Sequence, residues 1–113
     1  MPAYIVAHVD VQDWDKYCEY MKYTPRCIAA FGGRFIARGG ETETLEGAPE
    51  PSRIVLIEFP SIEQAKAFYR SEEYTRTKKL REGGGTARFV AIAGYAPDAW
   101  QADLATSRAM PPL

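Results

Sequence analysis

One segment in the first half of the chain, residues 32–58, constrains the fold more than any other. It reads Gly-Gly-Arg-Phe-Ile-Ala-Arg-Gly-Gly, then an acidic loop from Glu41 to Ser52, then Arg-Ile-Val-Leu-Ile-Glu. Runs rich in β-branched and aromatic residues, bounded by glycine and proline, are typical of strands. The segment therefore predicts two strands, residues 34–38 and 53–59, joined by a loop with Arg38 and Arg53 at its ends.

Two more strands are predicted by the same criterion, at residues 4–9 and 88–93. Between the first two strands, large apolar side chains recur at steps of three and four, which predicts a helix with one buried stripe. Pro25 lies inside this helix and removes an amide donor, so we expect a kink or a break near Tyr23. The core candidates are Trp14, Met21, Ile28, Phe31, Phe35, Phe59 and Phe68.

A second helix is predicted to begin after Ser61, which has Gln64 at the spacing of a capping box. Ser71 starts a separate short helix, and a tail begins at Pro97 with Asp98 as a candidate helix cap. The order is β-α-β-β-α-β, which predicts an α+β, ferredoxin-like domain: an antiparallel four-stranded sheet with both helices on one face. Residues 1–96 form this domain and residues 97–113 a C-terminal extension.

The strands are apolar on both sides, although the helices can cover only one face of the sheet. Residues 54–57 are Ile-Val-Leu-Ile and residues 89–93 are Phe-Val-Ala-Ile-Ala. A sheet with one solvated face should instead alternate apolar with polar residues. The sheet of a second copy would cover the other face and make a two-fold homodimer. The alternative is that the C-terminal tail folds back over the open face of a monomer.

Composition excludes several classes of protein. The 113 residues carry 14 basic and 15 acidic side chains without a basic stripe, so we expect no nucleic-acid partner. No apolar run approaches the ~20 residues that span a bilayer, and no signal peptide is evident, so a cytoplasmic protein without a membrane partner is expected. Cys18 and Cys27 fall on nearly opposite helix faces as packing residues, and His8 is the one histidine; no metal or cofactor is expected.

The chain resembles a bacterial family known only as domain of unknown function 1330, within the dimeric α/β-barrel superfamily. The matching pieces are Gly32-Gly33-Arg34-Phe35, Arg38-Gly39-Gly40, Glu46-Gly47, Arg53 with the following apolar run, Glu58-Phe59-Pro60-Ser61, and Tyr69-Arg70-Ser71-Glu72-Glu73-Tyr74 with Arg81. The resemblance covers about residues 3–96. It implies a ferredoxin-like protomer and a dimer whose two sheets form a barrel, but no established reaction. The wider superfamily includes small monooxygenases, isomerases, haem-degrading enzymes and binding proteins.

The antiparallel plan brings four basic side chains to one end of the sheet. The ends of the first two strands lie beside the starts of the last two, which gathers His8, Arg38, Arg53 and Arg88 there. We expect Tyr74 and Arg81, on the short helix, to lie close by. Such a cationic end suits a small anionic ligand, with Arg38, Arg53 and Arg81 holding the charge and Tyr74 orienting the molecule. His8 is the default general base because its side chain titrates near neutrality.

A structural interpretation competes with each of these roles. The arginines at the strand ends can pair with the glutamates of the loop, His8 can be a packing or surface residue, and Tyr74 a core aromatic. Glu58, at the opposite end of its strand, is expected to pair with Arg34 because an unpaired carboxylate in an apolar run is costly.

Three functional hypotheses follow. The first is a homodimeric protein that binds a small anionic organic molecule, with or without cofactor-free catalysis. The second is a non-catalytic dimeric module for binding or interaction. The third, haem binding through His8, is disfavoured because the usual ligand lies on a helix.

Overall fold

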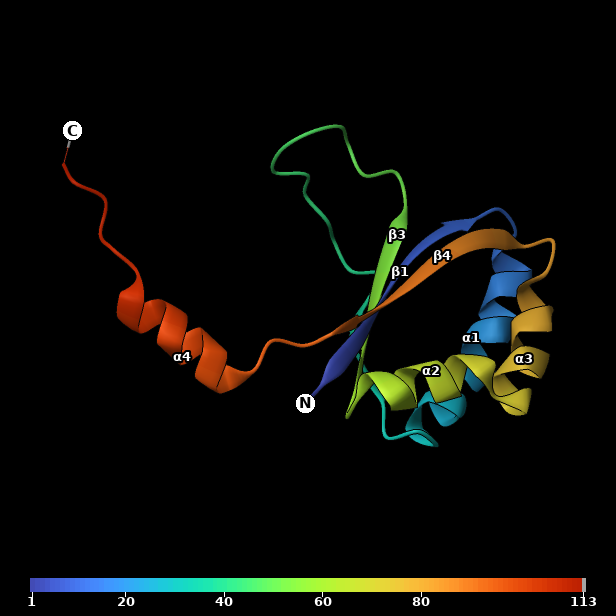
Figure 1. The fold of residues 1–113 in the computed structure, drawn as a ribbon. Helices are drawn as coiled ribbons and strands as arrows, with labels where there is room; N and C mark the ends of the chain where they lie inside the picture. The colour runs from blue at the N-terminus through green and yellow to red at the C-terminus, as the bar shows by residue number, and fades with distance from the viewer. Residues whose placement is uncertain (113) are drawn as a thin grey trace.

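Four strands form one antiparallel sheet in the order β2-β3-β1-β4, and three helices pack on one of its faces (Figure 1). The computed structural model describes residues 1–112. The elements are β1 (Ala3–Val11), α1 (Trp14–Ala29), β2 (Arg34–Arg38), β3 (Arg53–Phe59), α2 (Ile62–Arg70), α3 (Glu72–Lys78), a 3-10 turn η1 (Lys79–Arg81), β4 (Gly85–Ala93) and α4 (Pro97–Thr106). The predicted βαββαβ order and the antiparallel sheet are confirmed.

The central strand β1 shows how side chains are divided between the two faces of the sheet. Its residues alternate between fully buried side chains, among them Ala7 and Val9, and partly exposed ones, among them Val6 and His8. The buried set lies under the helices, and the other set points to the face that no helix covers. Directly opposite residues of antiparallel strands share a face, so Val9 and its partner Arg53 lie on the covered side.

Helix α1 runs unbroken from Trp14 to Ala29, so of the kink or break expected near Tyr23 the break is wrong. Asp13 caps the helix: its carboxylate accepts from the amides of Asp15 at 3.0 Å and Lys16 at 3.3 Å. Pro25 removes one backbone hydrogen bond from the interior of the helix. Packing of α1 against the sheet and α3 keeps the helix continuous despite that loss.

The core lies between α1, α2, α3 and the covered face of the sheet. Its largest fully buried side chains are Tyr74, Phe59, Phe68 and Cys27. Two packing predictions are wrong, because Cys18 is exposed and Trp14 is 54% exposed. Trp14 starts α1 at the rim of the sheet, where it lies beside Arg53 instead of in the core.

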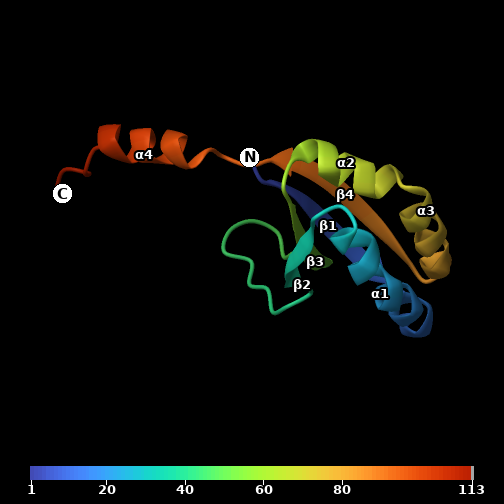
Figure 2. The same ribbon diagram turned by 90° about the horizontal axis from the view of Figure 1, so that it is seen from below.

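The other face of the sheet is apolar and uncovered. Its side chains include Tyr4, Val6, Ile54, Leu56, Val90 and Ile92. Helix α4 does not fold back over them; it projects from the end of β4, away from the sheet in both views (Figures 1 and 2). Pro97 is the first residue of α4 and Ala96 its cap, so the prediction of Asp98 as the cap is wrong. In residues 1–112, no helix has the length and apolarity needed to cross a membrane.

The predicted pair at the far end of β2 and β3 is confirmed. Arg34 and Glu58 are directly opposite in the register, and Arg34 Nε donates to Glu58 Oε1 at 3.2 Å. The arginine side chain is 72% exposed, so the pair lies at the surface and contributes little to stability.

Candidate functional site

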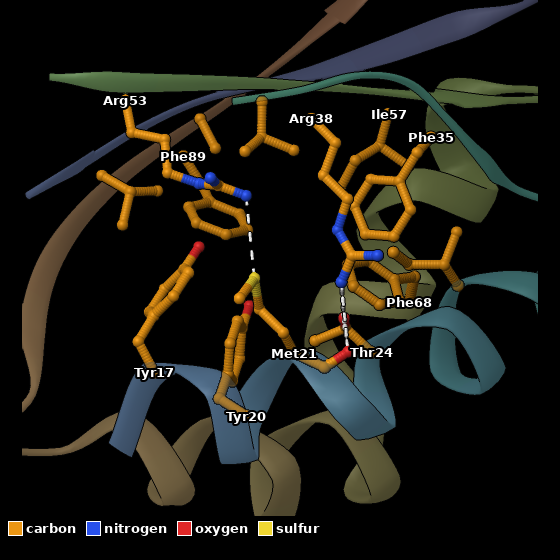
Figure 3. A pocket seen from close by; sticks show the side chains of 14 residues that line it. Tyr17, Tyr20, Met21, Thr24, Phe35, Arg38, Arg53, Ile57, Phe68 and Phe89 are labelled. Atoms are coloured by element: carbon orange, nitrogen blue, oxygen red, sulfur yellow. Dashed lines mark hydrogen bonds between the residues drawn. The ribbon is translucent and has the colours of Figure 1, made fainter. Parts of the chain in front are cut away.

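A narrow slot lies between α1 and the covered face of the sheet (Figure 3). Its free volume is about 20 Å³, which is room for one water molecule. Helix α1 supplies one wall and the sheet most of the other, and apolar side chains dominate both. The lining residues are Ala7, Val9, Tyr17, Tyr20, Met21, Thr24, Ile28, Phe35, Arg38, Arg53, Val55, Ile57, Phe68 and Phe89.

Arg53 reaches from the start of β3 down into the slot (Figure 3). Its Nη2 donates to the Met21 sulfur at 3.6 Å, and its guanidinium carbon lies 5.7 Å from the Tyr17 ring centroid. The Nε atom is buried and has no hydrogen-bond partner within the described residues. A thioether is a weak acceptor, so the cation has no strong partner in this conformation.

Gly39 makes the position of Arg53 feasible. Its φ is +67°, in the left-handed region that favours glycine, and a Cβ built there would collide with the Arg53 guanidinium. The amide of Gly39 donates to the carbonyl of Ile54 at 2.9 Å, which holds the turn against β3. Gly39 therefore allows both the turn after β2 and the observed position of the Arg53 guanidinium.

Arg38 is held by a carbonyl that a proline has released. Pro25 has no N–H to donate to the carbonyl of Met21, four residues earlier. Arg38 Nη2 donates to that oxygen instead, at 3.1 Å, and lies 3.5 Å from the Thr24 hydroxyl (Figure 3). Its guanidinium carbon is 4.1 Å from the Phe35 ring centroid. The proline that the sequence marks as a helix breaker thus supplies an acceptor at the slot.

The slot arginines have no acidic partner in the part of the chain that the structure describes. The ion pairs of residues 1–112 are His8–Glu50, Lys22–Glu19 and Arg34–Glu58. Pairing of Arg38 or Arg53 with the loop glutamates, the structural alternative, is therefore not found. Beside the slot, the polar partners of the partly buried Arg53 and the exposed Arg38 are a carbonyl, a hydroxyl and a thioether.

Tyr74 lies behind the slot. It is completely buried and does not line the slot, but its hydroxyl is 2.7 Å from the hydroxyl of Tyr20, which does. Burial first, and then the neighbouring Tyr74, raise the pKa of Tyr20 far above its ordinary value, and burial also raises the pKa of Tyr74. Arg81 places its guanidinium carbon 5.2 Å from the Tyr20 ring centroid. Both phenols are therefore neutral at physiological pH.

His8 does not share the slot with the arginines, contrary to the expectation from the strand ends. It lies at the same end of the sheet but on the uncovered face, opposite Arg88 of β4. There His8 Nδ1 is 3.5 Å from Glu50 Oε1, and Ser52 Oγ donates to Asp10 Oδ1 at 2.8 Å. The sheet separates His8 from Arg38 and Arg53, so a general base at His8 cannot act on a ligand in the slot.

Of the predicted site residues, the structure brings Arg38 and Arg53 into the slot, places Tyr74 and Arg81 behind Tyr20, and leaves His8 outside. Two slot residues, Tyr20 and Thr24, were not predicted from the sequence. Both lie on the side of α1 that carries Tyr17 and Met21, at steps of three and four residues. That spacing is typical of one helix face, and it could have identified both residues from the sequence. Residues 1–112 contain no group of three side chains placed to hold a metal ion.

The topology and the slot define a ferredoxin-like α+β protein with its candidate site between helix and sheet. The chain belongs to the family described as domain of unknown function (DUF1330), whose model matches residues 2–95. A search of curated proteins gave no significant match.

Solved structures with low sequence identity share the fold. A protein of unknown function from Rhodopseudomonas palustris, RPA0582, has a TM-score of 0.67 at 17% identity over 85% of this chain and 84% of its own. A dimeric protein of unknown function with a ferredoxin-like fold from Bacteroides fragilis has 0.51 at 16% identity, covering 82% and 96%. SnoaB, a cofactor-independent oxygenase from Streptomyces nogalater, has 0.53 at 11% identity, covering 84% and 94%.

Proposed function

We propose that this protein binds a small organic anion in the slot between α1 and the sheet. The observation that carries the proposal is the state of Arg38 and Arg53. Neither has an acidic partner within the described residues, and both adjoin a slot with apolar walls. Arg53 is partly buried and its Nε has no hydrogen-bond partner within the described residues, which is costly. A bound carboxylate or enolate would reduce that cost by accepting from Arg53 and from the more exposed Arg38 beside it.

A bound anion could replace the present hydrogen-bond acceptors of the two arginines. Arg53 donates to a thioether and Arg38 to a main-chain carbonyl, and both partners belong to Met21. An anionic oxygen is a stronger acceptor than either of these. The methionine side chain is unbranched and flexible, so its movement can widen the slot beyond one water molecule. The aromatic walls, among them Tyr17 and Phe35, would then contact the apolar body of the ligand.

The proposal includes a homodimer. The uncovered face of the sheet carries apolar side chains such as Val6, Leu56 and Val90, and α4 leaves them exposed. Contiguous apolar side chains on an uncovered sheet face often mark an interface. Packing of two such faces against each other would bury both, and the fold neighbour from Bacteroides fragilis is described as dimeric.

The fold neighbours also support a catalytic form of the proposal. SnoaB is described as a cofactor-independent oxygenase, and a Caulobacter crescentus protein with a TM-score of 0.53 as a putative antibiotic biosynthesis monooxygenase. A cofactor-free reaction on a bound organic anion would place the chemistry in the slot. His8 would have no part in it, because it lies across the sheet.

Calorimetric titration with 3-nitrobenzoate, a carboxylate on a flat apolar ring, tests the proposal. We expect saturable binding that Arg53→Gln and Arg38→Gln each weaken about tenfold, the effect of losing one charge-assisted hydrogen bond. Arg88→Gln is the matched control: it removes the same charge at the same end of the sheet, but from the other face. Equal losses in all three variants, or no binding to the wild type, would contradict a site in the slot.

A second candidate function, a non-catalytic interaction module, is favoured by α4. Trp100 and Leu104 lie one turn apart on this helix, and each is 55% exposed. Removal of residues 97–113 tests this role. Loss of self-association in the truncated chain would assign the helix to an interface between copies. An unchanged sedimentation profile would remove that support.

A further inference from the structure

Besides the two arginines, the slot has a second polar group, the hydroxyl of Tyr20, which is hydrogen-bonded to Tyr74. Tyr20 is 6% exposed and lines the slot, whereas Tyr74 is completely buried behind it. Their hydroxyls are 2.7 Å apart, so one of them donates to the other. Which one donates decides whether a hydrogen-bond donor points into the slot.

Hydrogen-bond accounting favours one of the two directions. In the described part of the chain, the Tyr20 hydroxyl is the one acceptor found for the Tyr74 hydrogen. Arg81, the charged neighbour of the pair, carries only donors and cannot accept the Tyr74 hydrogen. If Tyr20 donated to Tyr74, the hydrogen of Tyr74 would be buried without an acceptor, which is costly. If Tyr74 donates, the remaining hydrogen belongs to Tyr20, which lines a slot with room for one water molecule as acceptor.

We propose that Tyr20 is the hydrogen-bond donor of the slot, and that its ligand carries a carbonyl or phenolate oxygen in addition to an anionic group. This inference rests on the proposed function, because the anionic group would bind at Arg38 and Arg53. Tyr74 is a positioning residue: it donates to Tyr20 and thereby directs the Tyr20 hydrogen outward. Donation from Tyr74 also polarises the Tyr20 hydroxyl and makes it a stronger donor.

Two further observations support a donor at this position. Burial is the largest cause of the raised pKa of Tyr20, so its hydroxyl keeps its hydrogen at physiological pH. Arg81 lies over the rings of both Tyr20, at 5.2 Å, and Phe89, at 5.8 Å, which leaves a positive charge near the proposed oxygen. A neutral donor beside a fixed cation stabilises negative charge on a ligand oxygen.

The test uses two probes that differ by one hydroxyl. 3-Nitrobenzoate offers only a carboxylate for the arginines, whereas 4-hydroxy-3-nitrobenzoate adds a phenol whose ionisation is visible in its absorption spectrum. We expect the bound phenol to ionise at least about one pH unit below the free phenol, because Tyr20 donates to its oxyanion. Tyr20→Phe should abolish most of this shift and Tyr74→Phe part of it.

Tyr23→Phe is the matched control, since Tyr23 is also a tyrosine of α1 but is 53% exposed and does not line the slot; it should keep the shift. A shift that persists in Tyr20→Phe, or a bound probe that ionises as in water, overturns the inference but leaves the proposed function standing if 3-nitrobenzoate still binds. Failure of both probes to bind overturns both.

The direction of the hydrogen bond has a test that needs no ligand. Hydroxyl hydrogen exchange, followed by NMR on isotope-labelled tyrosines, should be at least about tenfold slower for Tyr74 than for Tyr20, because only Tyr74 has its hydrogen engaged within the protein. Slower exchange at Tyr20, or equal rates, would overturn the assignment of the donor.

Discussion

At one end of the sheet, charged side chains on the two faces have different surroundings. On the covered face, Arg38 and Arg53 have no acidic partner in the described residues and adjoin an apolar slot. On the uncovered face, His8 lies beside Glu50, and Ser52 bonds Asp10. Arg88, opposite His8 on the uncovered face, has no ion pair among the described residues either, so the covered face is set apart by the apolar slot that its two arginines adjoin.

The uncovered face makes the strongest prediction. Val6 lies at its centre, opposite Leu56 and Val90. In the proposed dimer, Val6→Asp would bury a carboxylate against a second apolar sheet, so we expect the dimer to dissociate at least about a hundredfold more readily, a cost of about 3 kcal/mol or more. Analytical ultracentrifugation measures the change.

The control for that variant is Tyr23→Asp, which adds the same charge at a residue of α1 that is 53% exposed. It should leave the mass in solution unchanged. If the wild type already sediments as one subunit, the uncovered face is not an interface between copies.

On the covered face, Gly39 and Gly40 form a matched pair of substitutions. An alanine at Gly39 would need a positive φ and would displace the Arg53 guanidinium, whereas a Cβ at Gly40 meets no atom. We expect Gly39→Ala to lower the free energy of unfolding by about 1–3 kcal/mol and to weaken binding of 3-nitrobenzoate. Gly40→Ala should change neither. Urea denaturation and calorimetry measure the two effects, and equal behaviour of the two variants would contradict the role given to Gly39.

The buried pair Tyr20 and Tyr74 predicts how the free energy of unfolding changes at alkaline pH. The raised pKa of Tyr20 means that the folded protein holds this proton when the unfolded chain has lost it, above the ordinary tyrosine pKa near 10. Stability is therefore retained below about pH 10 and falls as the pH rises further, by up to about 1.4 kcal/mol per pH unit for each such proton. The groups that face Tyr20 are Tyr17, Tyr74 and Arg81.

Urea denaturation between about pH 9 and pH 11 measures this slope around the ordinary tyrosine pKa. Tyr20→Phe removes one of the two raised phenols and should flatten it. A slope unchanged in Tyr20→Phe would show that the decline comes from other groups.

Sequence patterns predicted the sheet, the helices and the end of the sheet where the basic residues gather. They did not assign those residues to faces. Alternation along β1 was enough to put His8 and Val9 on opposite faces, but the register that pairs Val9 with Arg53 comes from the structure. The Tyr20–Tyr74 bond was beyond prediction because it joins residues 54 positions apart and depends on how α3 packs on α1. The released carbonyl of Met21 was predictable in principle, since Pro25 follows it by four residues.

The smallest of the expected effects comes from the Met21 carbonyl and its hydrogen bond to Arg38. Pro25→Ala would restore an amide that competes with Arg38 for the Met21 oxygen, now 3.1 Å from Arg38 Nη2. We expect the free energy of unfolding to rise by about 1 kcal/mol, the usual contribution of one hydrogen bond, while the affinity for 3-nitrobenzoate falls a few-fold as Arg38 loses its position. Thr24→Val, which removes the other polar neighbour of Arg38, should weaken binding without the gain in stability. Stability and affinity that rise together in Pro25→Ala would show that the released carbonyl does not position Arg38, which would then be held by Thr24 and by packing on the Phe35 ring.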